Sequence, residues 1–286
     1  MAATGETWTH HEGVVNGVRL HWVEAGTGPL VVLLHGFPEF WYEWRHLLPA
    51  LSAAGFRAVA PDMRGYNLSD KPKGTEPYAV RHLAADAAAL VRHLGEARAH
   101  LVGHDWGGVV AWRVAMDHAE VVDRLVIVNA PHPRIFAREL RTPKQALKSA
   151  YAAFFQLPAA PEAVFRARGF AMVERVFRSE PRPGAYTDED IARYKEAIAR
   201  PGALRAMIDY YRAAVRHPAG ESRTVAAPTL VVWGEDDAHL NVENTIGLEE
   251  HVPDVRVVRL PGVSHWVPAD VPDELAELVT RFLHAA

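Results

Sequence analysis

The sequence predicts an α/β fold in which a mostly parallel, doubly wound sheet is interrupted by an inserted helical segment. Three observations predict it. Short apolar runs rich in valine and leucine alternate with longer amphipathic segments. Runs such as Val31-Val32-Leu33-Leu34 are apolar on both faces, as expected of parallel strands that helices cover on both sides. The alternation stops between Pro131 and Pro218, where helical patterns are punctuated by prolines.

A hairpin is the first expected element. Val14–Val15 and Val18–Val23 flank Asn16-Gly17, a dipeptide typical of a two-residue hairpin turn. The sheet is therefore expected to begin antiparallel and to continue parallel. The later strands are expected at Leu30–Leu34, Phe56–Ala60, His100–Gly103, Leu125–Asn129, Thr229–Trp233 and Val255–Leu260.

Two helices are clear from the spacing of apolar residues. The first is expected over Tyr78–Leu94, with Gly95 as its C-terminal cap. The last helix of the chain carries Leu275, Leu278 and Val279 on one face. Strands that alternate with such helices favour a doubly wound sheet.

Length, charge and composition limit the classes of function. The 286 residues are enough for one large domain with an insertion. We expect a core in residues 1–132 and 219–286, and a helical cap in residues 133–218. The net charge of −4 without a basic stripe argues against nucleic acid, and the absence of cysteine excludes thiolate chemistry. No apolar run approaches the roughly 20 residues of a membrane helix. The expectation is a soluble, cytoplasmic protein without a membrane partner, either a monomer or a homodimer.

The segment Leu101-Val102-Gly103-His104-Asp105-Trp106-Gly107-Gly108 has the pattern of a nucleophile elbow. Such an elbow is a sharp strand-to-helix turn that presents one side chain at the top of a sheet. The usual residue is serine, but here it is Asp105. An aspartate is ionised at neutral pH, so it can attack a saturated carbon directly and form an alkyl ester. The plainer alternative is that Asp105 is only a helix N-cap.

Two further groups complete a candidate triad. Asp237 follows the strand that ends near Trp233, and His265 lies between the final strand and the last helix. The order nucleophile, acid, histidine is the order used with such an elbow. The acid would orient the imidazole, and the imidazole would deprotonate the water that cleaves the ester. Asp236 is a rival for the acid.

The loop His35-Gly36-Phe37-Pro38 follows the strand Leu30–Leu34. In elbow enzymes, an N–H of this loop and the N–H after the nucleophile form the oxyanion hole. The amides of Phe37 and Trp106 are therefore the expected donors. The alternative is a tight turn that uses glycine and proline only for shape.

On these residues the chain resembles the soluble epoxide hydrolase-like members of the α/β-hydrolase fold family. The matching motifs are His35-Gly36-Phe37-Pro38-Glu39 with Trp41 and Trp44-Arg45, Asp62-Met63-Arg64-Gly65-Tyr66, Gly103-His104-Asp105-Trp106-Gly107-Gly108, and the loops of Asp237 and His265. The resemblance covers nearly the whole chain. It departs at Asn67, where the family usually has glycine. Asparagine tolerates positive φ better than most residues, so the turn can survive.

The resemblance implies two cap tyrosines that protonate the epoxide oxygen. Tyr151 resembles the first, and Tyr211 the second, with Tyr210 as its competitor. It implies a small apolar epoxide and water as reactants, and neither a metal nor an organic cofactor. The residues Phe37, Trp106, Phe154, Phe155 and Leu157 near the candidate site predict a largely apolar pocket.

Other activities of the same fold remain as alternatives. A haloalkane dehalogenase would have a second halide donor, from an asparagine in the loop or a cap tryptophan. The loop has Phe37 there, and residues 131–218 contain no tryptophan. A haloacid dehalogenase would have arginines after the nucleophile, where this chain has Trp106-Gly107-Gly108. A non-catalytic ligand-binding protein would not need the histidine base. A carboxylesterase would need an elbow serine.

Overall fold

The computed structural model describes residues 8–285 and has an eight-stranded sheet at its centre. The strand order is β1-β2-β4-β3-β5-β6-β7-β8. The strands are β1 (Thr9–Val15), β2 (Val18–Ala25), β3 (Leu30–Leu34), β4 (Arg57–Pro61), β5 (Ala99–His104), β6 (Val122–Val128), β7 (Thr229–Gly234) and β8 (Val255–Leu260).

The sheet changes direction where the sequence predicts it. β2 runs antiparallel to both β1 and β4, and all later neighbours pair in parallel. The turn between β1 and β2 has positive φ at Asn16 (50°) and Gly17 (78°), as a tight hairpin of this type requires. The expected mostly parallel α/β sheet is thus confirmed.

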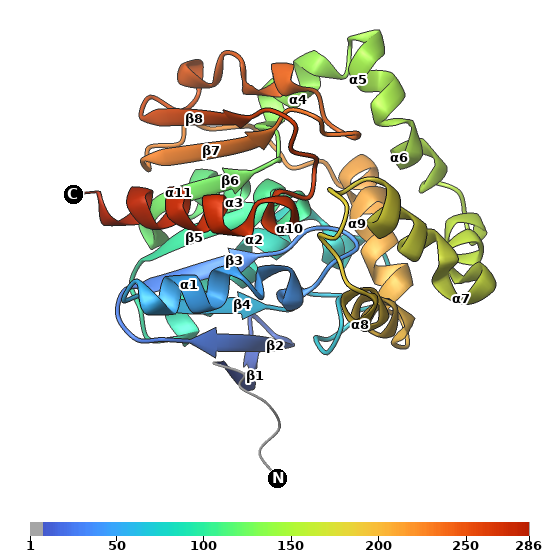
Figure 1. The fold of residues 1–286 in the computed structure, drawn as a ribbon, viewed down its shortest axis with the longest axis horizontal. Coiled ribbons are helices and arrows are strands. Elements are labelled where there is room, and N and C mark those ends of the chain that lie inside the picture. Colours follow the sequence, from blue (N-terminus) through green and yellow to red (C-terminus); the bar gives the residue numbers. More distant parts are fainter. Residues whose placement is uncertain (1–7, 286) are drawn as a thin grey trace.

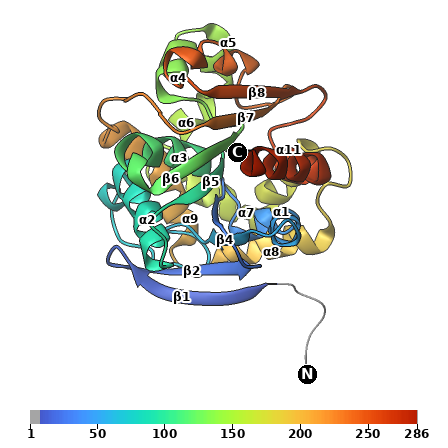
Figure 2. The ribbon, with the colours of Figure 1, turned by 90° about the vertical axis from the view of Figure 1, so that its left-hand side faces the viewer.

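Helices cover both faces of this sheet. Helices α1 (Leu47–Ala53) and α11 (Pro272–His284) pack together on one face, while α2 (Val80–His93) and α3 (Trp106–Asp117) pack on the other (Figures 1 and 2). Because both faces are covered, all five residues of β3 are buried. The core therefore fixes the strand ends, which carry the candidate site.

All the regular secondary structure between β6 and β7 is helical. The helices are α4 (Pro133–Glu139), α5 (Pro143–Lys148), α6 (Ala150–Phe154), α7 (Ala160–Ser179), α8 (Asp188–Ala199) and α9 (Ala203–Arg216). Helices α6 to α9 gather on one side of the sheet (Figure 1). Proline opens α4 and α5 and stands in the first turn of α7, consistent with the preference of proline for the start of a helix.

Several boundaries differ from the expected ones. β1 begins at Thr9 rather than near Val14, and the ends of β4, β5, β7 and α2 are displaced by one or two residues. Strand β6 begins at Val122, three residues before the expected start, and Val122 pairs with Ala99 of β5. The charged pair Asp123-Arg124 conceals this part of the strand in a search for apolar runs. Helix α7 is interrupted at residues 167–170, where φ is positive at Arg168, Gly169 and Phe170, although no proline stands there.

No helix within residues 8–285 combines the length and apolarity that a membrane crossing requires.

Candidate active site

Asp105 sits in a strained turn between β5 and α3. Its φ of 48° and ψ of −119° are unusual for a residue other than glycine. The turn also needs glycine nearby, because a Cβ on Gly107 would lie 1.9 Å from the carbonyl oxygen of Leu34. A Cβ on Gly103 would lie 2.4 Å from the carbonyl oxygen of Gly107. The strand and the helix can therefore approach each other closely, and the sharp turn between them presents the Asp105 side chain away from the backbone.

The carboxylate of Asp105 does not act as a helix cap. It occupies the N-cap position of α3 but accepts no hydrogen bond from the first turn. Its Oδ1 instead accepts a hydrogen bond of 2.8 Å from the backbone N–H of Phe37. Phe37 belongs to the loop that follows β3. The plainer N-cap interpretation is therefore wrong for this side chain.

The expected acid and histidine meet at the ends of β7 and β8. The Nδ1 of His265 lies 2.6 Å from Oδ2 of Asp237. Both side chains are buried, with exposures of 3% and 1%. The rival Asp236 is exposed. The Nε2 of His265 lies 3.7 Å from Oδ2 of Asp105, which is longer than a hydrogen bond.

Asp237 is held by several donors. Its Oδ2 also accepts a hydrogen bond of 2.6 Å from Asn129, and its Oδ1 accepts from the backbone N–H groups of His239 and Leu240 at 2.6 and 2.8 Å. Burial alone would raise the pKa of Asp237, but the charge and hydrogen bond of His265 outweigh it and lower this pKa to about 2. The same interaction outweighs the burial of His265 and raises the pKa of its imidazole.

A cavity of about 220 Å³ opens beside these groups. Asp105, His265, Tyr151 from α6 and Tyr211 from α9 all line it. Most of the remaining wall is apolar and includes Phe37, Phe154, Phe155, Phe165, Val173 and Trp266. Of the expected pocket residues, Trp106 and Leu157 do not line the cavity. The ring of Trp106 packs against Tyr211, which does line it. Leu157 is 49% exposed, because it lies in the turn before α7 rather than on an inward helix face.

The two tyrosines lie next to one another in this wall. Their ring centroids are 5.8 Å apart, and the ring of Tyr211 packs edge-on against Trp106. Burial raises the pKa of both hydroxyls, and for Tyr151 the nearby charge of Asp105 raises it further. Both tyrosines therefore stay protonated at neutral pH. The competitor Tyr210 turns away, since its hydroxyl donates a hydrogen bond of 2.6 Å to the carbonyl of Arg64.

The two expected oxyanion donors differ in what the structure gives them. The Phe37 N–H already contacts Asp105. Trp106 opens α3, and the first N–H groups of a helix have no acceptor within it. The place of this N–H in the oxyanion hole therefore stays a prediction.

Sequence reasoning missed several groups around the site. Asn129 has a φ of 39° just after β6, and its side chain also joins β7 through the N–H of Gly234 at 2.8 Å. His239 in the cavity wall pairs with Glu180 at 2.8 Å. Asn129 could have been found in the sequence as a polar residue directly after a buried strand. For Glu180 the sequence offers no such signal.

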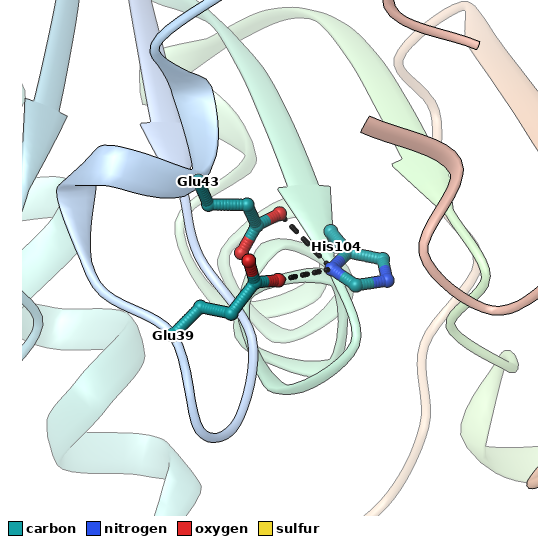
Figure 3. A group of neighbouring side chains, drawn as sticks. All are labelled: Glu39, Glu43 and His104. Carbon is teal, nitrogen blue, oxygen red and sulfur yellow. Dashed lines mark ion pairs between the residues drawn. The ribbon is translucent and has the colours of Figure 1, made fainter. Parts of the chain in front are cut away.

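One group of buried side chains has the composition of a metal site. Among residues 8–285, atoms of Glu39, Glu43 and His104 that could bind a metal ion lie within 4.8 Å of one another (Figure 3). Glu39 stands in the motif of the Phe37 loop, but sequence reasoning had assigned no function to these three residues.

Comparisons with known proteins agree with this geometry. Residues 29–271 match the family model described as alpha/beta hydrolase fold. The chain is 40% identical over 272 residues to AB hydrolase superfamily protein YfhM of Bacillus subtilis, covering 94% of this chain and 95% of that protein. It is 39% identical over 277 residues to epoxide hydrolase 4 of Mus musculus, covering 94% of this chain and 77% of that protein.

Solved structures give the same result. A crystal structure of Bacillus megaterium epoxide hydrolase in complex with an inhibitor has a TM-score of 0.88 at 33% identity, covering 96% of this chain and all (100%) of that one. Epoxide hydrolase A from Mycobacterium thermoresistibile has a TM-score of 0.86 at 30% identity, covering 98% and 99%. These similarities agree with the aspartate elbow and with the paired histidine and acid. The chain belongs to the alpha/beta hydrolase fold family and, within it, to the epoxide hydrolases.

Proposed function

We propose that the protein converts a small apolar epoxide to a vicinal diol through a covalent ester on Asp105. The observation that carries this proposal is the convergence of four groups on one cavity: the Asp105 carboxylate, the two hydroxyls of Tyr151 and Tyr211, and the His265 imidazole. An epoxide needs a nucleophile on one side and a proton donor on the other, and this cavity contains both.

In the first step, Asp105 attacks a ring carbon. The N–H of Phe37 holds Oδ1, so Oδ2 is the oxygen left to form the new carbon–oxygen bond. The ring carbon–oxygen bond breaks, and its electron pair goes to the epoxide oxygen. Tyr151 and Tyr211 bind this oxygen, and one of them transfers its proton to it. Because their pKa values are raised, both hydroxyls keep their protons until the alkoxide forms.

In the second step, water hydrolyses the ester. His265 removes a proton from water, and the resulting hydroxide attacks the carboxyl carbon of Asp105. The charge that develops on Oδ1 is stabilised by the N–H groups of Phe37 and Trp106. The intermediate collapses, and the leaving alkoxide takes the proton from His265 to give the diol. The proton left on the Asp105 carboxyl group returns to the tyrosinate of the first step, which restores the free carboxylate. Asp237 orients His265 and stabilises its protonated form, in line with their 2.6 Å contact.

The cavity supports an apolar substrate of limited size. Aromatic and aliphatic side chains form most of its wall, and its ionisable side chains are Asp105, Tyr151, Tyr211, His239 and His265. Such a pocket binds through burial of apolar surface and uses few polar groups to fix orientation. No cofactor takes part in either step.

Single turnover in ¹⁸O-labelled water tests the ester. Excess enzyme is mixed with styrene oxide, and the diol and the Asp105 peptide are analysed by mass spectrometry. The first diol should carry the unlabelled oxygen of Asp105, and the label should appear in the carboxylate. Label in that first diol would refute the covalent route. Release of bromide from an alkyl bromide at a rate that matches epoxide opening would instead support the dehalogenase alternative.

A further inference from the structure

Behind the nucleophile lie three ionisable side chains with almost no exposure to solvent. Glu39 and Glu43 belong to the segment after the Phe37 loop, and His104 is the last residue of β5, directly before Asp105. Their exposures are 1%, 2% and 0%. Figure 3 shows both carboxyl groups directed at the same edge of the imidazole. None of the three lines the cavity, so the mechanism above leaves them without a role.

Glu43 connects this cluster to the loop that holds Asp105. Its Oε2 accepts a hydrogen bond of 2.7 Å from the N–H of Gly36. The next N–H, that of Phe37, is the one that donates to Asp105. Glu43 therefore fixes the peptide that precedes the oxyanion donor.

His104 connects the cluster to the base. Its Nε2 lies 3.0 Å from the backbone carbonyl of His265, and a carbonyl only accepts hydrogen bonds. The hydrogen on Nε2 is thus assigned. Its Nδ1 lies 2.9 Å from Oε1 of Glu43. Two lone pairs at this distance would repel, so one proton must lie between Nδ1 and Oε1. These two atoms and Oε2 of Glu39 have no hydrogen-bond partner outside the cluster among the described residues, while the carboxyl groups of Glu39 and Glu43 also interact with each other.

We propose that Glu43 and His104 share this buried proton and act together as a positioning pair, which holds the Phe37 loop and the His265 loop in the geometry needed for ester hydrolysis. This inference rests on the proposed function. The pair touches neither substrate nor the reacting atoms. It acts through Gly36 on one side and through the His265 carbonyl on the other.

The surroundings favour the protonated form of the carboxyl groups. Burial, and then the charge of Glu43, raises the pKa of Glu39 to about 8, and burial raises the pKa of Glu43 well above its usual value. The positive charge of Arg45 lowers both pKa values, but by less than burial raises them. On its other side, Glu39 accepts a hydrogen bond of 3.0 Å from Tyr186.

A metal ion in the same place is the rival explanation. Nδ1 of His104 and Oε1 of Glu43 are at hydrogen-bond distance, whereas Oε2 of Glu39 stands 3.8 Å from Nδ1. A shared proton accounts for the short contact directly. Addition of Zn²⁺ or of a chelator should then leave kcat unchanged, and activation of the purified enzyme by the metal would overturn the proton assignment.

The pair should matter more for the second step than for the first. The Phe37 amide and the His265 base act together on the ester, while the first attack needs neither proton removal nor the intermediate's oxyanion. Loss of the pair should lower kcat by about 10- to 100-fold, less than the roughly 10²–10³ typical of removing a whole oxyanion donor. Because alkylation continues, kcat/KM should change little and ester should accumulate.

Two variants of Glu43 separate these effects. Glu43→Met keeps the length of the side chain but removes both polar contacts. Glu43→Gln can accept from Gly36 and donate an N–H to Nδ1, as the protonated carboxyl does. In rapid-quench experiments with styrene oxide, we expect E43M to accumulate the Asp105 ester and E43Q to stay within about threefold of wild-type kcat. Wild-type kcat and ester levels in E43M would overturn the proposal, as would equal losses in both variants.

A double-variant cycle and a spectroscopic measurement complete the test. If the two residues act as one unit, E43M combined with His104→Leu should lower kcat no further than the worse single variant. If E43M does not fold, ¹⁵N-histidine NMR of the wild-type enzyme should show a strongly downfield proton correlated with Nδ1 of His104. Its absence would overturn the shared proton. Wild-type enzyme that forms neither ester nor diol would instead refute the proposed function.

Discussion

In the proposed mechanism, His265 acts as a base in one tautomer and one orientation, and its contact with Asp237 favours both. The contact of 2.6 Å places the hydrogen on Nδ1 and leaves Nε2 directed at Asp105, 3.7 Å away. The gap is consistent with the chemistry, because an aspartate nucleophile needs no base for its own attack. His265 is required only when water enters.

Asp237→Asn should therefore affect the rate and its pH dependence together. Loss of the carboxylate removes the interaction that raises the pKa of His265, so the acid limb of the kcat profile should move to lower pH. The rate should fall by up to about 10⁴-fold, as found when such an acid is replaced and the tautomer is lost. A profile of kcat against pH for wild type and variant measures both. An unchanged acid limb would mean that His265 is not the titrating base.

In the proposed mechanism, Tyr151 and Tyr211 act in the first step, the opening of the epoxide. Tyr151→Phe and Tyr211→Phe keep the ring packing and remove only the hydroxyls. We expect the double variant to lose about 10²–10⁴-fold in kcat/KM, the usual contribution of a general acid. Ester should not accumulate, in contrast to variants that impair His265. Tyr210→Phe is the matched control, since its hydroxyl bonds to a backbone carbonyl outside the cavity. Full epoxide turnover in the double variant would exclude the tyrosines as proton donors.

At the level of elements, the elbow depends on close contact between α3 and the strands beneath it. Gly107 has no room for a side chain, because its Cβ would meet the backbone of Leu34 at 1.9 Å. The position of Asp105 is therefore a property of how β3, β5 and α3 pack, as well as of the local sequence.

Gly107→Ala should separate α3 from β3 and displace Asp105. We expect loss of most activity and a free energy of unfolding lowered by several kcal/mol, since neither neighbour is a flexible side chain. Gly74→Ala is the control. Gly74 has a φ of 91° with open space around it. Backbone strain in Gly74→Ala should therefore lower the free energy of unfolding by only about 1–2 kcal/mol, and the variant should keep its kcat. Urea unfolding measures the free energy of unfolding of both variants, and steady-state kinetics measure their kcat. A fully active G107A would contradict the packing argument.

The existence and type of the elements were easier to predict than their exact ends. β3 and β8 match the expected ranges because their apolar runs end at turn residues. The early start of β6 could not be predicted, because Asp123 and Arg124 lie in the strand and only pairing with β5 reveals it. The interruption of α7 has no proline to mark it. The limits of the helical cap at residues 133 and 218 stay a prediction.

For the whole molecule, buried acids govern how stability depends on pH. The pKa of Glu39 is raised from an ordinary 4.5 to about 8, so the folded protein keeps a proton that the unfolded chain has released. Stability should fall as pH rises through this interval. Asp237 has the opposite effect, because its pKa is lowered from 3.8 to about 2, and its contribution is lost only as pH falls through that range.

Glu39→Gln tests the alkaline part of this dependence. The amide cannot ionise, so the free energy of unfolding should decline less between about pH 4.5 and about pH 8 than it does in wild type. Urea unfolding at several pH values measures the slope. Glu162→Gln serves as the control, because Glu162 pairs with Arg212 and its pKa is lowered. An equal slope in E39Q and wild type would show that Glu39 is ionised in the fold.

The sequence by itself determined the fold class, the aspartate elbow and the order of the candidate triad, because each of these leaves a local pattern; the two cap tyrosines came from the family resemblance. Spacing separates strand from helix, and glycines beside Asp105 mark a turn that few other residues could form. Only the tertiary structure shows that Asp237 and not Asp236 contacts His265, and that Tyr211 and not Tyr210 lines the cavity, since burial and direction depend on the packing of distant segments. It alone brought Glu39 and Glu43 against His104, because the end of β5 and the segment after β3 meet only in the folded sheet.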